Sequence, residues 1–107
     1  RRINWKINLI YSTSVEQLES IRDGVKKYIV DSNDFSTDGD LDPVVRIVEL
    51  GGSSIDLLVV AYADPMGFAA FNKVKENLIF NIMKIVKDNE SEFAYPSTSL
   101  YVESMPK

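Results

Sequence analysis

Hydrophobic and polar residues alternate with a period of two at the start of the chain. The apolar positions are Ile3, Trp5, Ile7, Leu9 and Tyr11, and the residues between them include Asn4, Lys6 and Asn8. Successive side chains of a strand point to opposite faces of a sheet. The pattern therefore predicts a strand over residues 3–11 with one buried face.

A helix with one apolar face is predicted next. Two capping boxes are open at its start, one formed by Thr13 with Glu16 and the other by Ser14 with Gln17. The apolar residues that follow share an arc of about 140°; they are Val15, Leu18, Ile21, Val25, Tyr28 and Ile29. Gly24 lies in the interior of this helix, where glycine costs on the order of 1 kcal/mol relative to alanine, and indicates a close contact.

Residues 31–43 contain five aspartates and no apolar periodicity, which predicts a loop. Two β-rich runs follow, residues 44–50 and 55–63, on either side of Gly51-Gly52-Ser53-Ser54. We predict an antiparallel hairpin in which at least one of the two glycines has a positive φ. The second run is apolar on both faces in its later half, so we expect it in the middle of the sheet.

The second helix is predicted to begin at Asp64-Pro65, with Asp64 as N-cap, and to end near Asp88. Its apolar residues cover about 180° of the circumference, more than the ~100° that seats a helix on a core. Phe80 lies outside even this arc. We therefore expect part of the apolar surface of this helix to be exposed in a monomer. A last strand is predicted over residues 97–104.

The element order βαββαβ predicts an α+β protein with a ferredoxin-like sandwich. Four antiparallel strands in the order 4-1-3-2 would carry both helices on one face. The length of 107 residues fits one domain over residues 1–107.

Composition removes several classes of function. The chain has no Cys and no His, so thiolate nucleophiles, Cys/His zinc sites and imidazole general bases are excluded. Its 12 basic against 16 acidic residues give a net charge of −4, which disfavours binding nucleic acid. No apolar run approaches the ~20 residues that span a bilayer. We expect no enzyme, no catalytic residue, no cofactor and no nucleic-acid partner.

The acidic loop raises the question of a calcium site. Asp38, Asp40, Asp42 and Glu49 match positions 1, 3, 5 and 12 of an EF-hand, but Pro43 occupies position 6, where glycine is required. A register that begins at Asp34 places Gly39 at position 6 and Val45 at position 12. We expect no specific metal site in either register.

Base stacking on RNA is one role open to the aromatic residues Trp5, Tyr11 and Tyr62. The third strand lacks the basic-glycine-aromatic run of such domains, and Lys and Arg do not cluster around these rings. We therefore expect these aromatic residues in the core or at an interface.

Residues 48–57, with the sequence VELGGSSIDL, resemble a segment typical of the small-conductance mechanosensitive channel family. Residues 93–102, FAYPSTSLYV, resemble the closing strand of that family, and residues 1–13 resemble the start of its carboxy-terminal domain. The three segments occur in the right order and cover essentially the whole chain. Ser97 stands where many members have glutamine, and the acidic loop is longer than usual.

This resemblance implies a membrane channel that opens under bilayer tension and releases ions and small solutes during osmotic downshock. The chain would be its carboxy-terminal domain, on the cytoplasmic side of the cell membrane, in a homo-oligomeric ring that is typically a heptamer. Residues 1–107 begin without Met and contain no pore helix, so we expect a fragment of a longer membrane protein.

Phe80 is the candidate for a subunit interface in such a ring. The alternative interpretation is that Phe80 is an isolated aromatic residue on the surface with no role in binding. We expect the isolated chain to be monomeric or weakly associated. The alternative function is a free-standing ferredoxin-like regulatory or ligand-binding module, and an enzyme ranks third.

Overall fold

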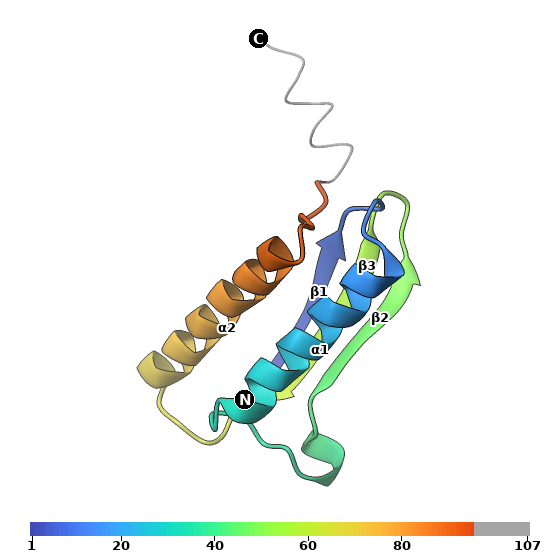
Figure 1. Cartoon of the computed structure of the whole chain (residues 1–107). Coiled ribbons are helices and arrows are strands. Elements are labelled where there is room, and N and C mark those ends of the chain that lie inside the picture. The colour runs from blue at the N-terminus through green and yellow to red at the C-terminus, as the bar shows by residue number, and fades with distance from the viewer. Residues whose placement is uncertain (96–107) are drawn as a thin grey trace.

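The computed structural model describes residues 1–95, so the strand predicted over residues 97–104 lies outside the described residues. The elements, in chain order, are β1 (Arg2–Leu9), α1 (Val15–Asp31), the short 3-10 helix η1 (Gly39–Leu41), β2 (Val44–Leu50), β3 (Ile55–Tyr62) and α2 (Phe68–Asp88). The two helices and three strands form an α+β layer structure (Figure 1).

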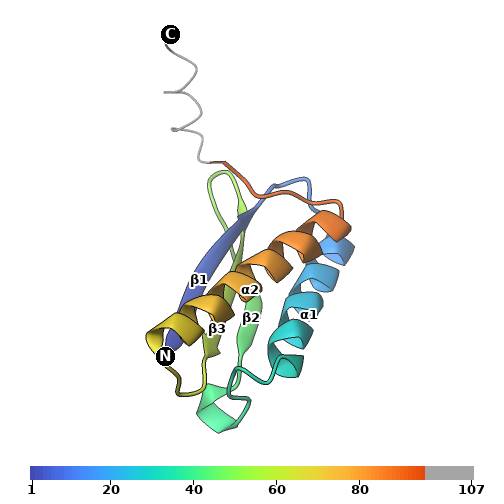
Figure 2. The ribbon, with the colours of Figure 1, turned by 90° about the vertical axis from the view of Figure 1, so that its left-hand side faces the viewer.

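The three strands form an antiparallel sheet in the order β1-β3-β2, as predicted for these strands. Both helices cover the same face of this sheet (Figures 1 and 2). β3 is central because its residues are apolar on both faces, and six of its eight positions are buried. The core between sheet and helices includes Leu57 of β3, Val25 of α1 and Leu78 of α2.

The capping box formed by Ser14 and Gln17 starts α1. The amide of Gln17 donates to the Ser14 hydroxyl at 3.1 Å, and the amide of Ser14 donates to the Gln17 side chain at 2.7 Å. Thr13 is buried and has another role, because its hydroxyl lies 2.7 Å from the Ile10 carbonyl and 2.8 Å from the Ser91 hydroxyl. Thr13 thus ties the start of α1 to the segment that follows α2.

The predicted start of α2 is wrong. The helix begins at Phe68 with Gly67 as N-cap, and its end at Asp88 is as predicted. The amide of Asp64 donates to the carbonyl of Asp34 at 2.9 Å, so Asp64 belongs to a connection held against the preceding loop. Asp64 and Pro65 therefore lie before the helix.

Gly24 marks a close contact between the two helices. A Cβ atom at this position would lie 3.3 Å from Cγ2 of Ile85 on α2. The sequence predicted a close contact here, and the structure identifies α2 as the partner.

The prediction of a positive φ at Gly51 or Gly52 is wrong. Among residues 1–95, Gly39 is the glycine with a positive φ, at 53°. Gly51 is needed for another reason, because a Cβ atom there would lie 3.1 Å from the Ser54 hydroxyl oxygen. The backbone of Gly51 also donates to the Ser54 carbonyl at 2.7 Å and closes the turn.

We expect Gly51→Ala to lower the free energy of unfolding by about 1 kcal/mol, because Ser54 is held by Asp56 and cannot readily yield to the added methyl group. Gly52→Ala is the matched control, since a Cβ atom there meets nothing within 4 Å. Its effect should stay within about 0.5 kcal/mol. Urea denaturation followed by circular dichroism measures both, and equal effects at the two positions would contradict the crowding argument.

Candidate functional site

A surface groove of about 830 Å³ lies along the C-terminal half of α2. We call it the α2 groove. Its apolar lining comprises Phe80, Met83, Val86, Phe93 and Tyr95, and its polar lining comprises Asn77, Asn81, Lys84, Lys87, Ser91 and Glu92.

The α2 groove exists because the apolar surface of α2 is wider than the sheet can cover. Leu78 and Ile82 point into the core and are buried. Phe80 and Met83 are 52% and 51% exposed, and Ile79 is exposed as well. The predicted excess of apolar surface on this helix is therefore confirmed.

The other wall of the groove is the segment after α2, residues 91–95. The amide of Ile10 donates to the Glu92 carbonyl at 3.1 Å, and the amide of Ala94 donates to the Asn8 carbonyl at 2.8 Å. Phe93 forms an antiparallel bridge with Leu9 at the end of β1. These bonds hold Phe93 and Tyr95 beside the end of α2.

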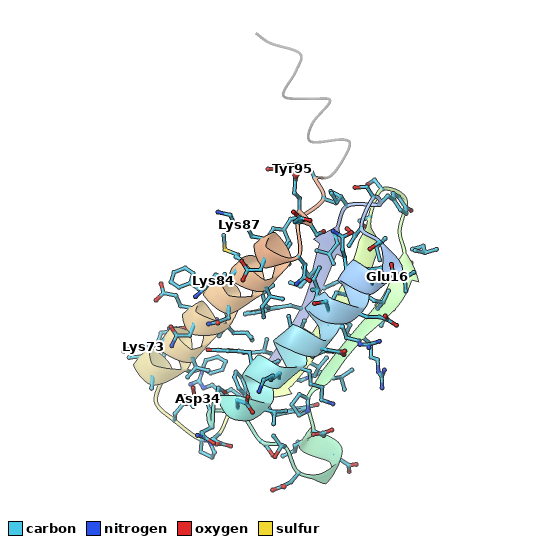
Figure 3. The ribbon with its side chains drawn as sticks, viewed as in Figure 1. Glu16, Asp34, Lys73, Lys84, Lys87 and Tyr95 are labelled. Atoms are coloured by element: carbon cyan, nitrogen blue, oxygen red, sulfur yellow. The ribbon has the colours of Figure 1, made fainter. Side chains whose placement is uncertain are left out.

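The charge beside the groove is basic. Lys84 and Lys87 lie with Lys73 along the side of α2 that faces away from α1 (Figure 3). None of the ion pairs among residues 1–95 involves these lysines. Glu92 is the acidic side chain in the lining. The groove therefore combines apolar surface with a modest excess of positive charge.

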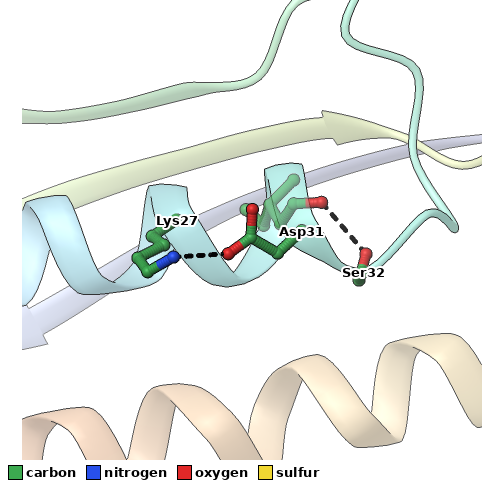
Figure 4. A network of polar contacts seen from close by, with 4 residues as sticks. Lys27, Asp31 and Ser32 are labelled. Atoms are coloured by element: carbon green, nitrogen blue, oxygen red, sulfur yellow. Dashed lines mark hydrogen bonds and ion pairs between the residues drawn. The ribbon is translucent and has the colours of Figure 1, made fainter.

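The ion pairs of the described residues involve β1, β2, α1 and the loop before β2. Lys27 donates to Asp31 at 2.6 Å near the end of α1, where the Ser32 hydroxyl also donates to the Ile29 carbonyl (Figure 4). The bond to Asp31 raises the pKa of Lys27. Arg22 donates to Asp23 at 2.8 Å and lowers the pKa of that carboxyl. The latter pair borders a second, charged hollow of about 540 Å³ between α1 and β2.

The residues with EF-hand spacing do not come together. Asp38, Asp40 and Asp42 flank or lie in η1, whereas Glu49 on β2 pairs with Lys6 across the sheet at 3.6 Å. Residues 1–95 contain no group of three or more acidic side chains able to hold a metal ion. The absence of a specific calcium site stays a prediction.

The aromatic residues weighed as an RNA platform lie on different faces. Trp5 opposes Val59 on the face that carries the helices, whereas Tyr62 opposes Arg2 on the other face. Trp5 packs against the core. These two rings cannot form one stacking surface.

Sequence reasoning singled out Phe80 and missed most of the residues around it. Lys73 lies seven residues before Phe80. Lys84 and Lys87 lie four and seven residues after it. This spacing places all four on one side of a helix. Glu76 lies four residues before Phe80 and shares this side, so the helical period could have predicted a stripe of mixed charge with an excess of lysine. Phe93 and Tyr95 had no comparable signal, because their position depends on bonds to β1.

The described residues form a small α+β domain with a partly apolar groove along α2. The family model described as "Mechanosensitive ion channel MscS, C-terminal" matches residues 3–93. The chain belongs to this family of MscS carboxy-terminal domains.

Relatives found by sequence similarity belong to the same family. An MscS family protein of Aquifex aeolicus (strain VF5) is 35% identical over 107 residues, which are 100% of this chain and 28% of the relative. An MscS family protein of Helicobacter pylori (strain ATCC 700392 / 26695) is 33% identical over 96 residues, 89% of this chain and 15% of the relative. The chain thus spans less than a third of the length of either relative.

Solved structures show the same fold. Arabidopsis thaliana MSL1 has a TM-score of 0.79 at 17% identity, over 90% of this chain and 34% of that chain. Helicobacter pylori MscS in the closed state has a TM-score of 0.65 at 22% identity, over 89% of this chain and 35% of that chain. Within residues 1–95, neither helix has the combination of length and apolarity needed to cross a bilayer.

Proposed function

We propose that residues 1–107 are a single domain on the cytoplasmic side of a longer mechanosensitive channel, one that opens under bilayer tension and releases ions and small solutes on osmotic downshock. The observation that carries this proposal is the match of the MscS carboxy-terminal model over residues 3–93. Membrane-spanning segments outside this chain would sense the tension, and this domain would line a vestibule beneath the pore.

The proposal includes a complete ferredoxin-like sheet. A fourth strand over residues 97–104 would lie beside β1 and give the order 4-1-3-2. The Phe93–Leu9 bridge and the bond from Ala94 to Asn8 support it, because they already place the chain along the outer edge of β1. A strand in this position would also cover an open edge of the sheet.

The proposal also includes assembly into a homo-oligomeric ring, a heptamer by resemblance, with Phe80 at the contact between copies. The exposure of Phe80 and its place in the α2 groove support this assignment. We assign no catalytic residue, cofactor, metal or nucleic-acid partner to the domain. Membrane segments elsewhere in the protein would keep the copies at high effective concentration, so each contact can be weak.

The function is tested by patch-clamp recording of the longer protein in liposomes. We expect a conductance that appears when suction applies tension to the membrane and disappears when the suction is released. A protein that inserts into the liposomes and stays closed up to the rupture of the patch would contradict the proposal.

Phe80→Ser is expected to weaken assembly of the longer protein in detergent, because it removes the exposed apolar contact and leaves the core residues Leu78 and Ile82 in place. Leu41→Ser is the matched control, since Leu41 is also exposed and lies in η1, far from α2. Native mass spectrometry should show smaller species with Phe80→Ser alone. Intact complexes with both variants would remove Phe80 from the interface.

A further inference from the structure

A second exposed apolar surface lies on the side of the molecule opposite the α2 groove. Val15, in the first turn of α1, is 65% exposed, and Leu50, at the end of β2, is 72% exposed. We call the group of exposed residues Val15, Glu16, Glu19 and Leu50 the α1–β2 edge. The start of α1 and the end of β2 lie at the same end of the molecule in both ribbon views (Figures 1 and 2).

The charges of this edge are opposite to those beside the α2 groove. Glu16 and Glu19 are exposed, and α1 has no basic residue before Arg22. Lys84 and Lys87 supply positive charge at the groove. No ion pair within the described part of the chain involves any of these four charged residues. The α1–β2 edge is therefore acidic, whereas the lining of the α2 groove carries two lysines and one glutamate.

The two surfaces also lie at matching levels. Residues 91–95, which form one wall of the groove, lie at the same end of the molecule as the α1–β2 edge, whereas Arg1 lies at the opposite end (Figure 1). In a ring whose axis follows the direction from Arg1 to Tyr95, equivalent levels of neighbouring copies meet. Contacts between two different surfaces of identical chains are what close such a ring.

We propose that the α2 groove of one copy receives the α1–β2 edge of the next copy, with Val15 and Leu50 against Phe80 and Met83. This inference rests on the proposed function, which supplies the ring. The acidic loop that contains Asp40 is a poorer partner despite its charge, because η1 lies at the other end of the molecule (Figure 1). Two grooves facing each other would bring like charges together.

The contact is tested by disulfide trapping on the 107-residue chain, which has no native cysteine. A Met83→Cys chain is mixed at high concentration with an isotope-labelled Val15→Cys chain under mild oxidation. We expect a mixed disulfide between the two chains. The control replaces the second chain by an Asp40→Cys chain, whose exposed position lies outside the proposed contact. The Val15 pair should give at least about tenfold more mixed dimer, since a specific contact of 1.4 kcal/mol changes an equilibrium by that factor.

Charge reversal separates a specific contact from random collision. Lys84→Glu with Lys87→Glu, added to the Met83→Cys chain, should lower the yield of mixed dimer about fivefold, as expected for exposed ion pairs turned into repulsion. Glu16→Lys with Glu19→Lys, added to the Val15→Cys chain, should restore the yield. High salt should reduce the difference between the variants.

Several results would overturn the inference. These are equal yields with Val15→Cys and Asp40→Cys, a dominant disulfide between two Met83→Cys chains, the absence of mixed disulfide, or charge reversal without rescue. The proposed function is judged separately by the tension-activated conductance of the longer protein. A protein that conducts under tension and fails the trapping test would retain the proposed function and lose this contact. A protein that passes the trapping test and does not conduct under tension would retain this contact and lose the proposed function.

Discussion

Leu78→Ala should lower the free energy of unfolding by about 2–5 kcal/mol, the range for leucine truncations in a close-packed core. Leu78 is fully buried where α2 packs on the sheet, and it belongs to the main hydrophobic cluster. Truncation removes its apolar contacts and leaves a cavity that the surrounding side chains fill only in part. Because domains of this size are stable by about 5–15 kcal/mol, the loss would be a large fraction of the total stability.

The control is the next residue on the same helix. Ile79 is 43% exposed, and Ile79→Ala should cost less than about 1 kcal/mol, since the better helix propensity of alanine offsets part of the lost burial. Thermal and urea denaturation of both variants measures the difference. Similar losses at positions 78 and 79 would mean that the inward and outward faces of α2 are wrongly assigned.

Ser54→Ala should lower the free energy of unfolding by about 1–3 kcal/mol, the cost of leaving a buried polar group without its partner. The Ser54 hydroxyl donates to Oδ1 of Asp56 at 2.7 Å, and both residues are buried. Alanine would leave the Asp56 carboxylate without this donor at the entry to the central strand β3. The effect should therefore exceed that of removing an exposed hydroxyl.

Ser53→Ala provides that comparison, because Ser53 lies in the same turn and is exposed. We expect its effect to stay within about 0.5 kcal/mol. The double variant Ser54→Ala with Asp56→Leu should recover part of the loss, since it removes both polar groups. Failure of Ser54→Ala to differ from Ser53→Ala would show that the Ser54–Asp56 bond does not stabilise the turn.

The strands and the central turns of both helices could be predicted because periodic burial produces a periodic spacing of apolar residues in the sequence. The apolar alternation that contains Ile3 and Leu9 predicted β1, and the two-sided apolar run around Val59 predicted a central β3. These features follow from the solvent exposure of each position, which the residue type reports.

Features that depend on tertiary bonds could not be predicted in the same way. Asp64-Pro65 has the composition of a helix start, but the bond between Asp64 and Asp34 places it before α2. Gly51 is at a turn, as expected, and its role is to leave room for Ser54 and not to adopt a positive φ. In the first case the local pattern was correct about the helix and wrong about where it begins. In the second it was correct about the turn and wrong about the reason for the glycine.

One part of the candidate site could be predicted from the sequence, and another part could not. The width of the apolar arc on α2 and the outlying position of Phe80 were readable from the helical period, and the exposure of Phe80 and Met83 followed. The groove itself also needs Phe93 and Tyr95, which reach it through bonds between residues far apart in the chain. A hollow made by two distant segments leaves no local signal.

The most direct measurement for the central claim is an electron-microscopy structure of the longer protein in a membrane mimetic. We expect copies of this domain to form a closed ring below the membrane segments. In each copy Phe80 and Met83 should be buried against Val15 and Leu50 of the next. A protein without a ring of these domains, or a ring in which the outer face of α2 remains in solvent, would contradict the account.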